Sequence, residues 1–204
     1  ETGGTTGMPK QRIGWEDYKI DYSNFSESLA DEDFPRNGYW LMIGPTGPRR
    51  LRLSIEHLAN VRGCACYFVD LDPRWVKKLI TRGKGDQAKA YMEHVIDQAM
   101  TVINNRKVDA LFTTPKLLEA LGERLLKEDK SIPDVGIKGV FVGGTQMDPQ
   151  YTRFLIEEVL EERVKFVPTY GNTLMGLAQS LPVTKENKFS IIYHAPQPRA
   201  MLRV

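Results

Sequence analysis

The first ten residues combine the residue types that bind a phosphate group. Residues 1–10 hold three glycines, three threonines, one proline and one lysine. Glycine lets backbone N–H groups turn toward an anion, while threonine hydroxyls and Lys10 add a donor and a positive charge. The spacing is not that of a Walker A loop, because Met8 follows Gly7. The segment predicts a phosphate-binding loop; a flexible N-terminal tail is the alternative.

Two more polar segments directly follow short apolar runs that are typical of buried strands. Residues 143–145 follow the run 137–142, and residues 169–171 follow the run 164–167. Because parallel strands have their carboxyl ends at one edge of a sheet, and α/β sheets bind ligands at that edge, we expect the two segments to lie there together.

The elements that must position these segments alternate along the chain. We expect strands at 39–43, 64–69, 108–112, 137–142, 164–167, 189–193 and 200–204, and helices at 26–30, 49–62, 72–81, 86–105, 116–127 and 148–162. Three of the helices start at an Asp or Thr followed by proline, which is typical of an N-cap with proline at the first helical position. The alternation predicts an α/β fold with a largely parallel sheet flanked by helices on both faces.

Composition narrows the class of protein. The chain has 204 residues, 41% hydrophobic and 26% charged, with a net charge of +2. These values are typical of a soluble globular protein, and the charge is too small to indicate a nucleic acid or an anionic membrane as partner. There is no apolar run of bilayer length and no signal peptide. Because the chain starts inside a glycine-rich loop and stops in an expected strand, we expect residues 1–204 to be a single α/β unit from a longer polypeptide.

Cysteine and histidine do not suggest a metal site. Cys64 and Cys66 are the only cysteines, and they share a face of an expected strand. We expect buried free thiols, which fit a reducing, cytoplasmic location. His57, His94 and His194 are scattered without metal-ligand spacing, so we expect structural or surface roles.

Three further groups have two interpretations each. Asp70 and Asp72 could bind a metal at a strand end, but capping of the next helix explains Asp72 more simply. Residues 49–52 carry three arginines, expected to be a solvated helix start, with an anion-binding site as the alternative. Tyr39 and Trp40 are expected in the sheet core rather than in a ligand pocket.

Several segments together resemble one family. The order Thr-Gly-Gly-Thr-Thr-Gly-Met-Pro-Lys at 2–10 resembles the phosphate loop of the AMP-forming adenylating enzymes, which include acyl-CoA and aryl-CoA ligases. The segment 143–145 is similar to that family's Ser-Gly-Gly-Ala segment, and 170–173 to the start of its Tyr-Gly-x-Thr-Glu motif. The segment 115–118 resembles its Pro-x-Leu-Leu segment. The nearest resemblance is to phenylacetate-CoA-ligase-like proteins, over the middle of the large N-terminal domain.

The resemblance implies a reaction and its ligands. An aryl or similar carboxylic acid would be activated by ATP as an acyl-AMP, with release of pyrophosphate, and then transferred to coenzyme A. The implied cofactors are ATP, magnesium and coenzyme A, and the implied partners are small molecules, with no nucleic acid and no membrane. The implied nucleotide-binding residues are Thr2, Gly3, Gly4, Thr5, Thr6, Gly7, Gly143, Gly144, Thr145, Tyr170, Gly171 and Asn172.

Within that set, Tyr170 would stack on the adenine. In addition, the resemblance implies that Lys10 and Thr173 act in catalysis, Thr173 at the α-phosphate. One position departs from the motif: Leu174 stands where the family has a glutamate that helps to hold magnesium. Three alternatives follow from this departure: either another acidic residue takes the place of the glutamate, or magnesium binding is altered, or the activity is reduced. The alternatives are therefore a degenerate nucleotide-binding or scaffold domain, and an unrelated α/β enzyme with a coincidental loop. The thiol acceptor and the oligomeric state stay open.

Overall fold

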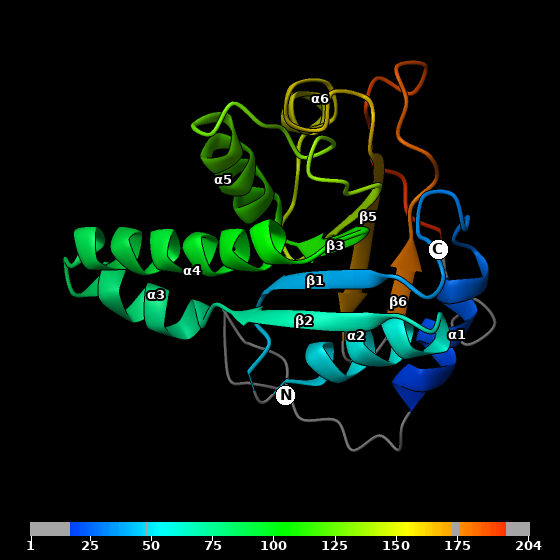
Figure 1. Ribbon diagram of the computed structural model, residues 1–204, viewed down its shortest axis with the longest axis horizontal. Helices are drawn as coiled ribbons and strands as arrows, with labels where there is room; N and C mark the ends of the chain where they lie inside the picture. The colour runs from blue at the N-terminus through cyan, green and yellow to red at the C-terminus, as the bar shows by residue number, and fades with distance from the viewer. Residues whose placement is uncertain (1–16, 48, 173–175, 195–204) are drawn as a thin grey trace, which may run out of the picture.

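The computed structural model describes residues 17–47, 49–172 and 176–194 (Figure 1). The strands are β1 (Tyr39–Gly44), β2 (Ala65–Asp70), β3 (Ala110–Thr113), β4 (Gly139–Val142), β5 (Lys165–Asn172) and β6 (Gly176–Gln179). The helices are α1 (Asp17–Glu27), α2 (Arg50–Val61), α3 (Pro73–Thr81), α4 (Gly85–Asn105), α5 (Pro115–Leu126), α6 (Pro149–Phe154) and the π-helix η1 (Leu155–Val159).

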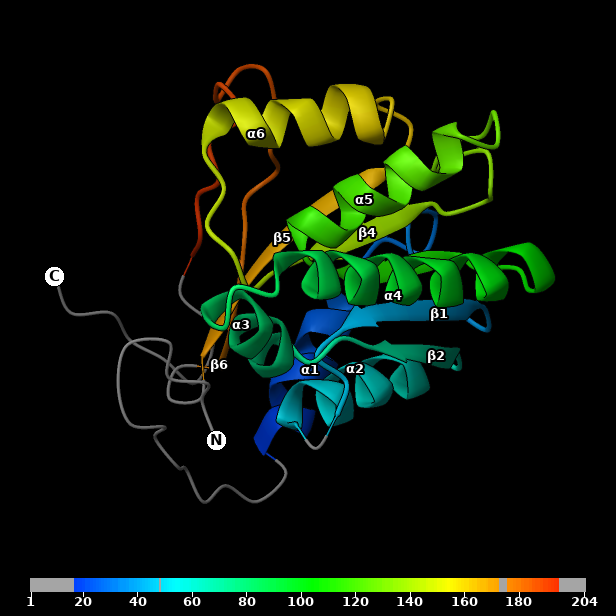
Figure 2. The ribbon, with the colours of Figure 1, turned by 90° about the vertical axis from the view of Figure 1, so that its left-hand side faces the viewer.

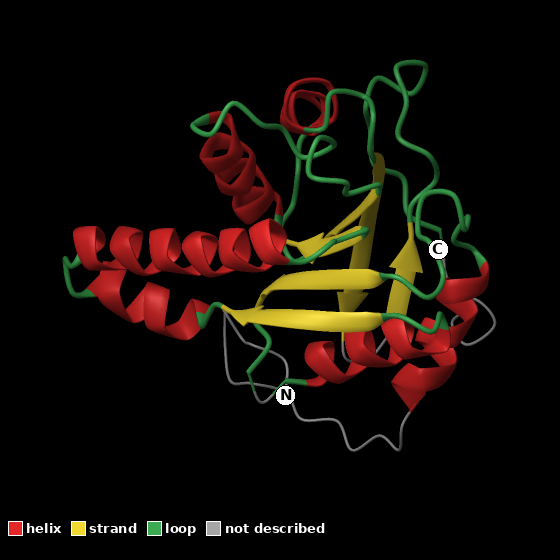
Figure 3. Cartoon of the chain, in the orientation of Figure 1, coloured by secondary structure: helices red, strands yellow, loops and turns green. Residues whose placement is uncertain are grey.

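The strands form one sheet in the order β2-β1-β3-β4-β5-β6. The pairings between β2, β1, β3, β4 and β5 are all parallel, and β6 adds to β5 in the antiparallel direction. The views along two directions place α1 and α2 on one side of the sheet and α4, α5 and α6 on the other (Figures 2 and 3). The predicted α/β fold, with a largely parallel sheet covered on both faces, is confirmed.

Alternation along β1 shows how the sequence fills two cores. Leu41 and Ile43 are fully buried in the cluster with α4 and α5, while Trp40 and Met42 are buried in the cluster with α1 and α2. Successive strand residues point to opposite faces, so an apolar run of this kind needs helices on both. Trp40 is therefore core, as expected, whereas Tyr39 is 43% exposed and stacks on another ring at the sheet's edge, which corrects its expected core position.

The three expected N-caps are confirmed. The carboxylate of Asp72 accepts from the N–H of Arg74, at 2.9 Å, and that of Asp148 accepts from the N–H of Tyr151, at 2.8 Å. The hydroxyl of Thr114 accepts from the third helical N–H of α5 at 3.4 Å. Because the N–H groups of a helix's first turn have no partner within the helix, these side chains fix where α3, α5 and α6 begin.

Helix boundaries differ from expectation in two places. The helix expected at 26–30 is wrong, since α1 ends at Glu27. The helix expected at 148–162 becomes a π-helix after Phe154. These departures follow from tertiary packing, which overrides local propensity in short segments.

The strands at the end of the chain differ more. β5 continues through Asn172 rather than stopping at Val167, because its second half pairs with β6, a strand that the sequence did not indicate. The strand expected at 189–193 forms only one bridge, between Ser180 and Tyr193. The strand expected at 200–204 lies outside the described residues.

Candidate nucleotide-binding site

The carboxyl ends of β4 and β5 lie side by side, because the two strands pair in parallel up to Val142 and Pro168. After β4, the N–H of Gly143 donates to the carbonyl oxygen of Thr113 at 3.2 Å and extends the sheet by one residue. Gly144 then turns the chain away with φ +82°, a conformation that favours glycine. The Gly-Gly pair thus has two separate functions, one in the sheet and one in the turn.

A pocket of about 780 Å³ opens at this edge. It is formed by the loop after β4, the second half of β5, one residue of β6 and the segment 190–194. The lining residues are Gly144, Thr145, Gln146, Met147, Pro149, Thr169, Tyr170, Gly171, Ala178, Ser190, Ile191, Tyr193 and His194. The expected meeting of the segments 143–145 and 169–171 at one edge of the sheet is confirmed.

The residues that the resemblance implied fall into those that line the pocket, those that support it and those that lie outside the described residues. Gly144, Thr145, Tyr170 and Gly171 line the pocket, and a Cβ atom at Gly144 would have nothing within 4 Å. Gly143 supports them from within the sheet, and Asn172 ends β5 opposite Gly176. The remaining implied residues, Thr2 to Gly7, Lys10 and Thr173, lie outside the described residues, as does Leu174.

An aromatic pair forms part of the pocket wall. The rings of Tyr170 and Tyr193 have their centroids 5.7 Å apart and their planes tilted by 47°. Tyr170 is 49% exposed and Tyr193 is 38% exposed, so both rings present surface to a ligand. Burial, and secondly the neighbouring Tyr170, raises the pKa of Tyr193 above its ordinary value.

Sequence reasoning missed the segment that carries Tyr193. Backbone hydrogen bonds hold it beside β6: the N–H of Leu181 donates to Ile192 at 2.8 Å, and that of His194 donates to Gln179 at 3.0 Å. His194 is exposed, as expected for a surface position, and it also lines the pocket. No signal in the sequence links this segment to the Tyr-Gly motif, because the contact depends on where β6 turns.

The other two histidines have the structural and surface positions that were expected. Nε2 of His57 lies 2.9 Å from the hydroxyl of Ser23 and 3.1 Å from the carbonyl oxygen of Lys19, which ties α2 to α1. His94 lies on the exposed side of α4, 2.6 Å from the side-chain nitrogen of Gln98.

The loop after β1 also follows a glycine, Gly44, and also lies at the carboxyl edge, but its N–H groups at Thr46 and Gly47 already have an acceptor. The carboxylate of Asp70 accepts from the N–H groups of Thr46 and Gly47, at 2.8 and 2.9 Å. Asp70 therefore closes this turn, and Asp72 caps α3. In the parts of the chain that the structure describes, no group of three or more His, Cys, Asp or Glu side chains could hold a metal.

The three arginines at the start of α2 are engaged within the protein. Arg49 pairs with Asp72 at 3.2 Å, and Arg50 pairs with Asp17 at 3.1 Å. The guanidinium of Arg52 lies over the ring of Phe68, 5.1 Å from its centroid. The expected solvated helix start is thus a set of contacts between elements, and these guanidinium groups already have partners.

Both cysteines are free thiols, as expected. Cys64 is buried, whereas Cys66 is only partly buried, which corrects the expectation for that side chain. Burial, with Glu56 and Cys64 as further causes, raises the pKa of Cys66 to about 12. A thiol in this state is a poor nucleophile, so Cys66 has the properties of a packing residue.

Comparison with known proteins gives matches among solved structures alone. The sequence matches no protein-family model, and no curated protein matches it. A structure of 2-hydroxyisobutyryl-CoA ligase with 2-HIB-AMP and CoA in the thioesterification state superposes with a TM-score of 0.50 at 16% identity, covering 85% of this chain and 32% of the ligase. An open conformation of that ligase gives 0.48 at 16% identity, with coverages of 79% and 33%. An ATP-bound RpMatB–BxBclM chimera gives 0.47 at 14% identity, with coverages of 79% and 27%.

The chain has the fold of part of a CoA ligase. It spans about a third of the length of the ligase structures that it matches. The resemblance to AMP-forming ligases is therefore confirmed at the level of the fold, and identities this low carry no argument about activity. Within the described ranges, no helix is long and apolar enough to cross a bilayer.

Proposed function

We propose that this chain is the nucleotide-binding core of an ATP-dependent acid–thiol ligase that is phenylacetate-CoA-ligase-like and acts on an aryl or similar carboxylic acid. One observation carries the proposal. Gly144 and Thr145 after β4, and Tyr170 and Gly171 in the second half of β5, form two walls of one pocket at the carboxyl edge of the parallel strands. This is the edge at which α/β folds bind nucleotides.

In this proposal the pocket holds the adenine. The half-exposed ring of Tyr170 stacks on the base, a contact worth about 1–3 kcal/mol. Gly144 and Thr145 form the facing wall, and the absence of a side chain at Gly144 lets its backbone approach the base. The loop 2–10 would hold the β- and γ-phosphates, and Thr173 would reach the α-phosphate.

The reaction would be attack by the substrate carboxylate on the α-phosphorus. A bond forms between the carboxylate oxygen and phosphorus, the bond to the bridging oxygen breaks, and pyrophosphate leaves; a thiol, proposed to be that of coenzyme A, then displaces AMP. Magnesium would supply charge that offsets the phosphates. The described residues do not offer it a ligand set, and Leu174 replaces the motif carboxylate, so no step is assigned to the metal.

We further propose that residues 1–204 form one α/β unit of a longer cytoplasmic polypeptide. In the family that this chain resembles, a ribose-binding aspartate and a lysine in a small C-terminal domain follow the Tyr-Gly motif. Those groups would complete the reaction, and this chain by itself would adenylate poorly.

ATP–pyrophosphate exchange tests the proposal. A polypeptide that includes this chain and its flanking regions would be assayed with a panel of aryl and small aliphatic acids, with and without magnesium. We expect exchange that requires both one acid of the panel and magnesium. Absence of exchange with every acid, while ATP still binds, would contradict the ligase and favour the alternative.

That alternative is a degenerate nucleotide-binding or scaffold domain, and Leu174 is the observation that favours it. The substitution Leu174→Glu restores the carboxylate that the motif has at this position. If the unmodified protein is inactive and Leu174→Glu produces exchange, the protein is a ligase that has lost its metal contact. If Leu174→Glu produces none although ATP binds, the domain is a scaffold.

A further inference from the structure

β5 changes its partner beside the pocket. Its first half, up to Pro168, pairs in parallel with β4, and its second half, from Thr169 to Asn172, pairs with β6. Proline has no N–H to donate, which suits it to the end of a ladder. The next side chain, Thr169, stands at the point where β5 leaves β4, directly before Tyr170.

The hydroxyl of Thr169 connects β5 to β4 at the point where the two strands separate. It is buried and donates to the carbonyl oxygen of Val142 at 3.2 Å, across the gap between β5 and β4. Gly143 packs directly against it, since a Cβ atom at that glycine would lie 2.9 Å from the hydroxyl oxygen and 3.2 Å from the carbonyl oxygen of Thr169. The last residue of β4 and the first glycine after it are therefore both held against this one side chain.

We propose that Thr169 is a positioning residue that sets the separation between the two walls of the pocket. One wall begins at Gly144, immediately after the residues that Thr169 holds, and the other is Tyr170, its neighbour in the chain. If β5 moved away from β4, the buried hydroxyl of Thr169 and the carbonyl oxygen of Val142 would both lose this hydrogen bond. Because unpaired buried polar groups cost free energy, the hydrogen bond opposes separation of the two strands. The consequence for ligand binding rests on the proposed function.

Thr113 provides an internal comparison. It is buried at the end of β3, and its hydroxyl donates to the carbonyl oxygen of Ile43, at the end of β1, at 3.0 Å. The chemistry is the same as at Thr169, and the acceptor again precedes a glycine turn. The Thr113 side chain does not line the pocket and bridges a different pair of strands. Removal of the Thr113 hydroxyl therefore measures how much stability is lost when a buried hydrogen bond between two strands is removed away from the pocket.

The test uses Thr169→Val, which exchanges the hydroxyl for a methyl group, Thr169→Ser, which keeps the hydroxyl, and the matched Thr113→Val. ATP is titrated by calorimetry and the unfolding temperature is measured. We expect both valine variants to melt about 2–4 °C lower. We expect Thr169→Val alone to bind ATP about fivefold more weakly, with Thr169→Ser close to the unmodified chain.

Equal ATP affinity in Thr169→Val and Thr113→Val would overturn the inference while leaving the proposed function intact. If the unmodified chain binds no ATP, the proposed function fails, and amide hydrogen exchange at Gly144 and Thr145 decides the positioning claim. Faster exchange there in Thr169→Val than in Thr113→Val supports it, and equal exchange overturns it. Thr169→Ala serves the same comparison if Thr169→Val does not fold.

Discussion

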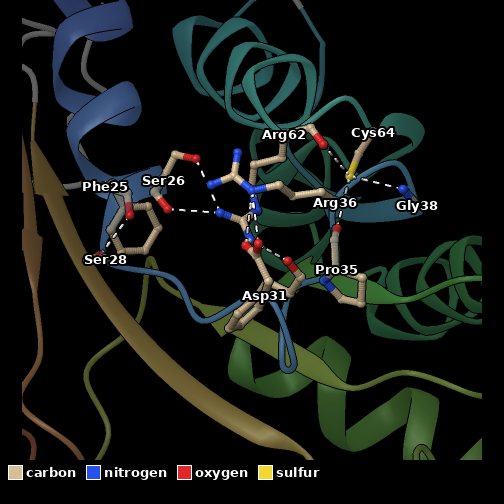
Figure 4. Close-up of polar contacts among 10 residues, drawn as sticks. Phe25, Ser26, Ser28, Asp31, Pro35, Arg36, Gly38, Arg62 and Cys64 are labelled. Atoms are coloured by element: carbon tan, nitrogen blue, oxygen red, sulfur yellow. Dashed lines mark hydrogen bonds and ion pairs between the residues drawn. The ribbon is translucent and has the colours of Figure 1, made fainter.

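The two edges of the sheet use polar groups in opposite ways. At the amino edge, polar side chains close on one another: the buried guanidinium of Arg62 donates to the carbonyl oxygens of Ser26 and Phe34 and pairs with Asp31 (Figure 4). The thiol of Cys64 lies in the same network, between Gly38 and a proline carbonyl. At the carboxyl ends of β4 and β5, in contrast, Gly144, Thr145, Tyr170 and Gly171 line a pocket.

The difference follows from what each edge must do. The connection from α1 to β1 has no regular structure between Ser28 and Gly38. The buried Arg62 donates to the carbonyl oxygen of Phe34 in this connection and to that of Ser26 at the end of α1. At the pocket, Thr169 is itself a lining residue, and its buried hydroxyl connects β5 to the end of β4. The region around Arg62 uses its polar groups to hold α1, the α1–β1 connection and the end of α2 together, whereas the ends of β4 and β5 leave surface that a ligand can contact.

The largest expected effect comes from opening the amino edge. Arg62→Met removes the guanidinium donor to the carbonyl oxygen of Phe34 and one of the two donors to that of Ser26, and should lower the free energy of unfolding by about 3 kcal/mol. Arg36→Met is the control, because Arg36 pairs with the same Asp31 but is 43% exposed, and its loss should cost less than about 1 kcal/mol. Urea unfolding measures both. Equal losses would show that burial of the guanidinium does not matter.

A second change tests how tightly the amino edge is packed. A Cβ atom at Gly139 would contact the ring of Phe34 and lie 2.7 Å from the carbonyl oxygen of Asp33, so Gly139→Ala should cost about 2 kcal/mol through overpacking. Gly85→Ala is the matched control, because nothing lies within 4 Å of that position at the start of α4. Thermal unfolding compares them, and a neutral Gly139→Ala would contradict the close packing.

A smaller effect concerns pH. Burial acts to raise the pKa of Asp31, but hydrogen bonds and charge from Arg36 and Arg62 outweigh it, and the pKa lies below its ordinary value. The contribution of ionised Asp31 to the free energy of unfolding is therefore complete above the ordinary carboxylate pKa of about 4. It is lost as the pH falls through the lowered pKa of the folded state. We expect Asp31→Asn to flatten the loss of stability in acid. An unchanged pH profile would show that Asp31 does not couple to folding.

The sequence predicted the parts that depend on local rules. The parallel sheet follows from apolar runs that must be covered on both faces, and the caps at Asp72, Thr114 and Asp148 follow from the needs of helix ends. The meeting of 143–145 and 169–171 follows from topology alone. The fold and half of the pocket were therefore within reach of sequence reasoning.

The remainder depends on contacts that no local pattern encodes. β6 and the segment 190–194 pair through a few backbone hydrogen bonds, and Tyr193 enters the pocket only because of them. The closure of the loop after β1 needs Asp70 from a neighbouring strand, although its glycines resemble those after β4. Composition could not distinguish the open glycine turn from the closed one, because the difference lies in what the adjacent strand supplies.

The central claim is that the carboxyl-edge pocket binds the adenine of ATP, and one titration tests it most directly. Tyr170→Ala is compared with Tyr39→Ala, which removes a similarly exposed ring at the opposite edge of the same sheet. Loss of base stacking should weaken ATP binding measured by calorimetry by about 1–3 kcal/mol in Tyr170→Ala, with Tyr39→Ala and Tyr170→Phe close to the unmodified chain. Unchanged affinity in Tyr170→Ala, or an equal loss in Tyr39→Ala, would contradict the account.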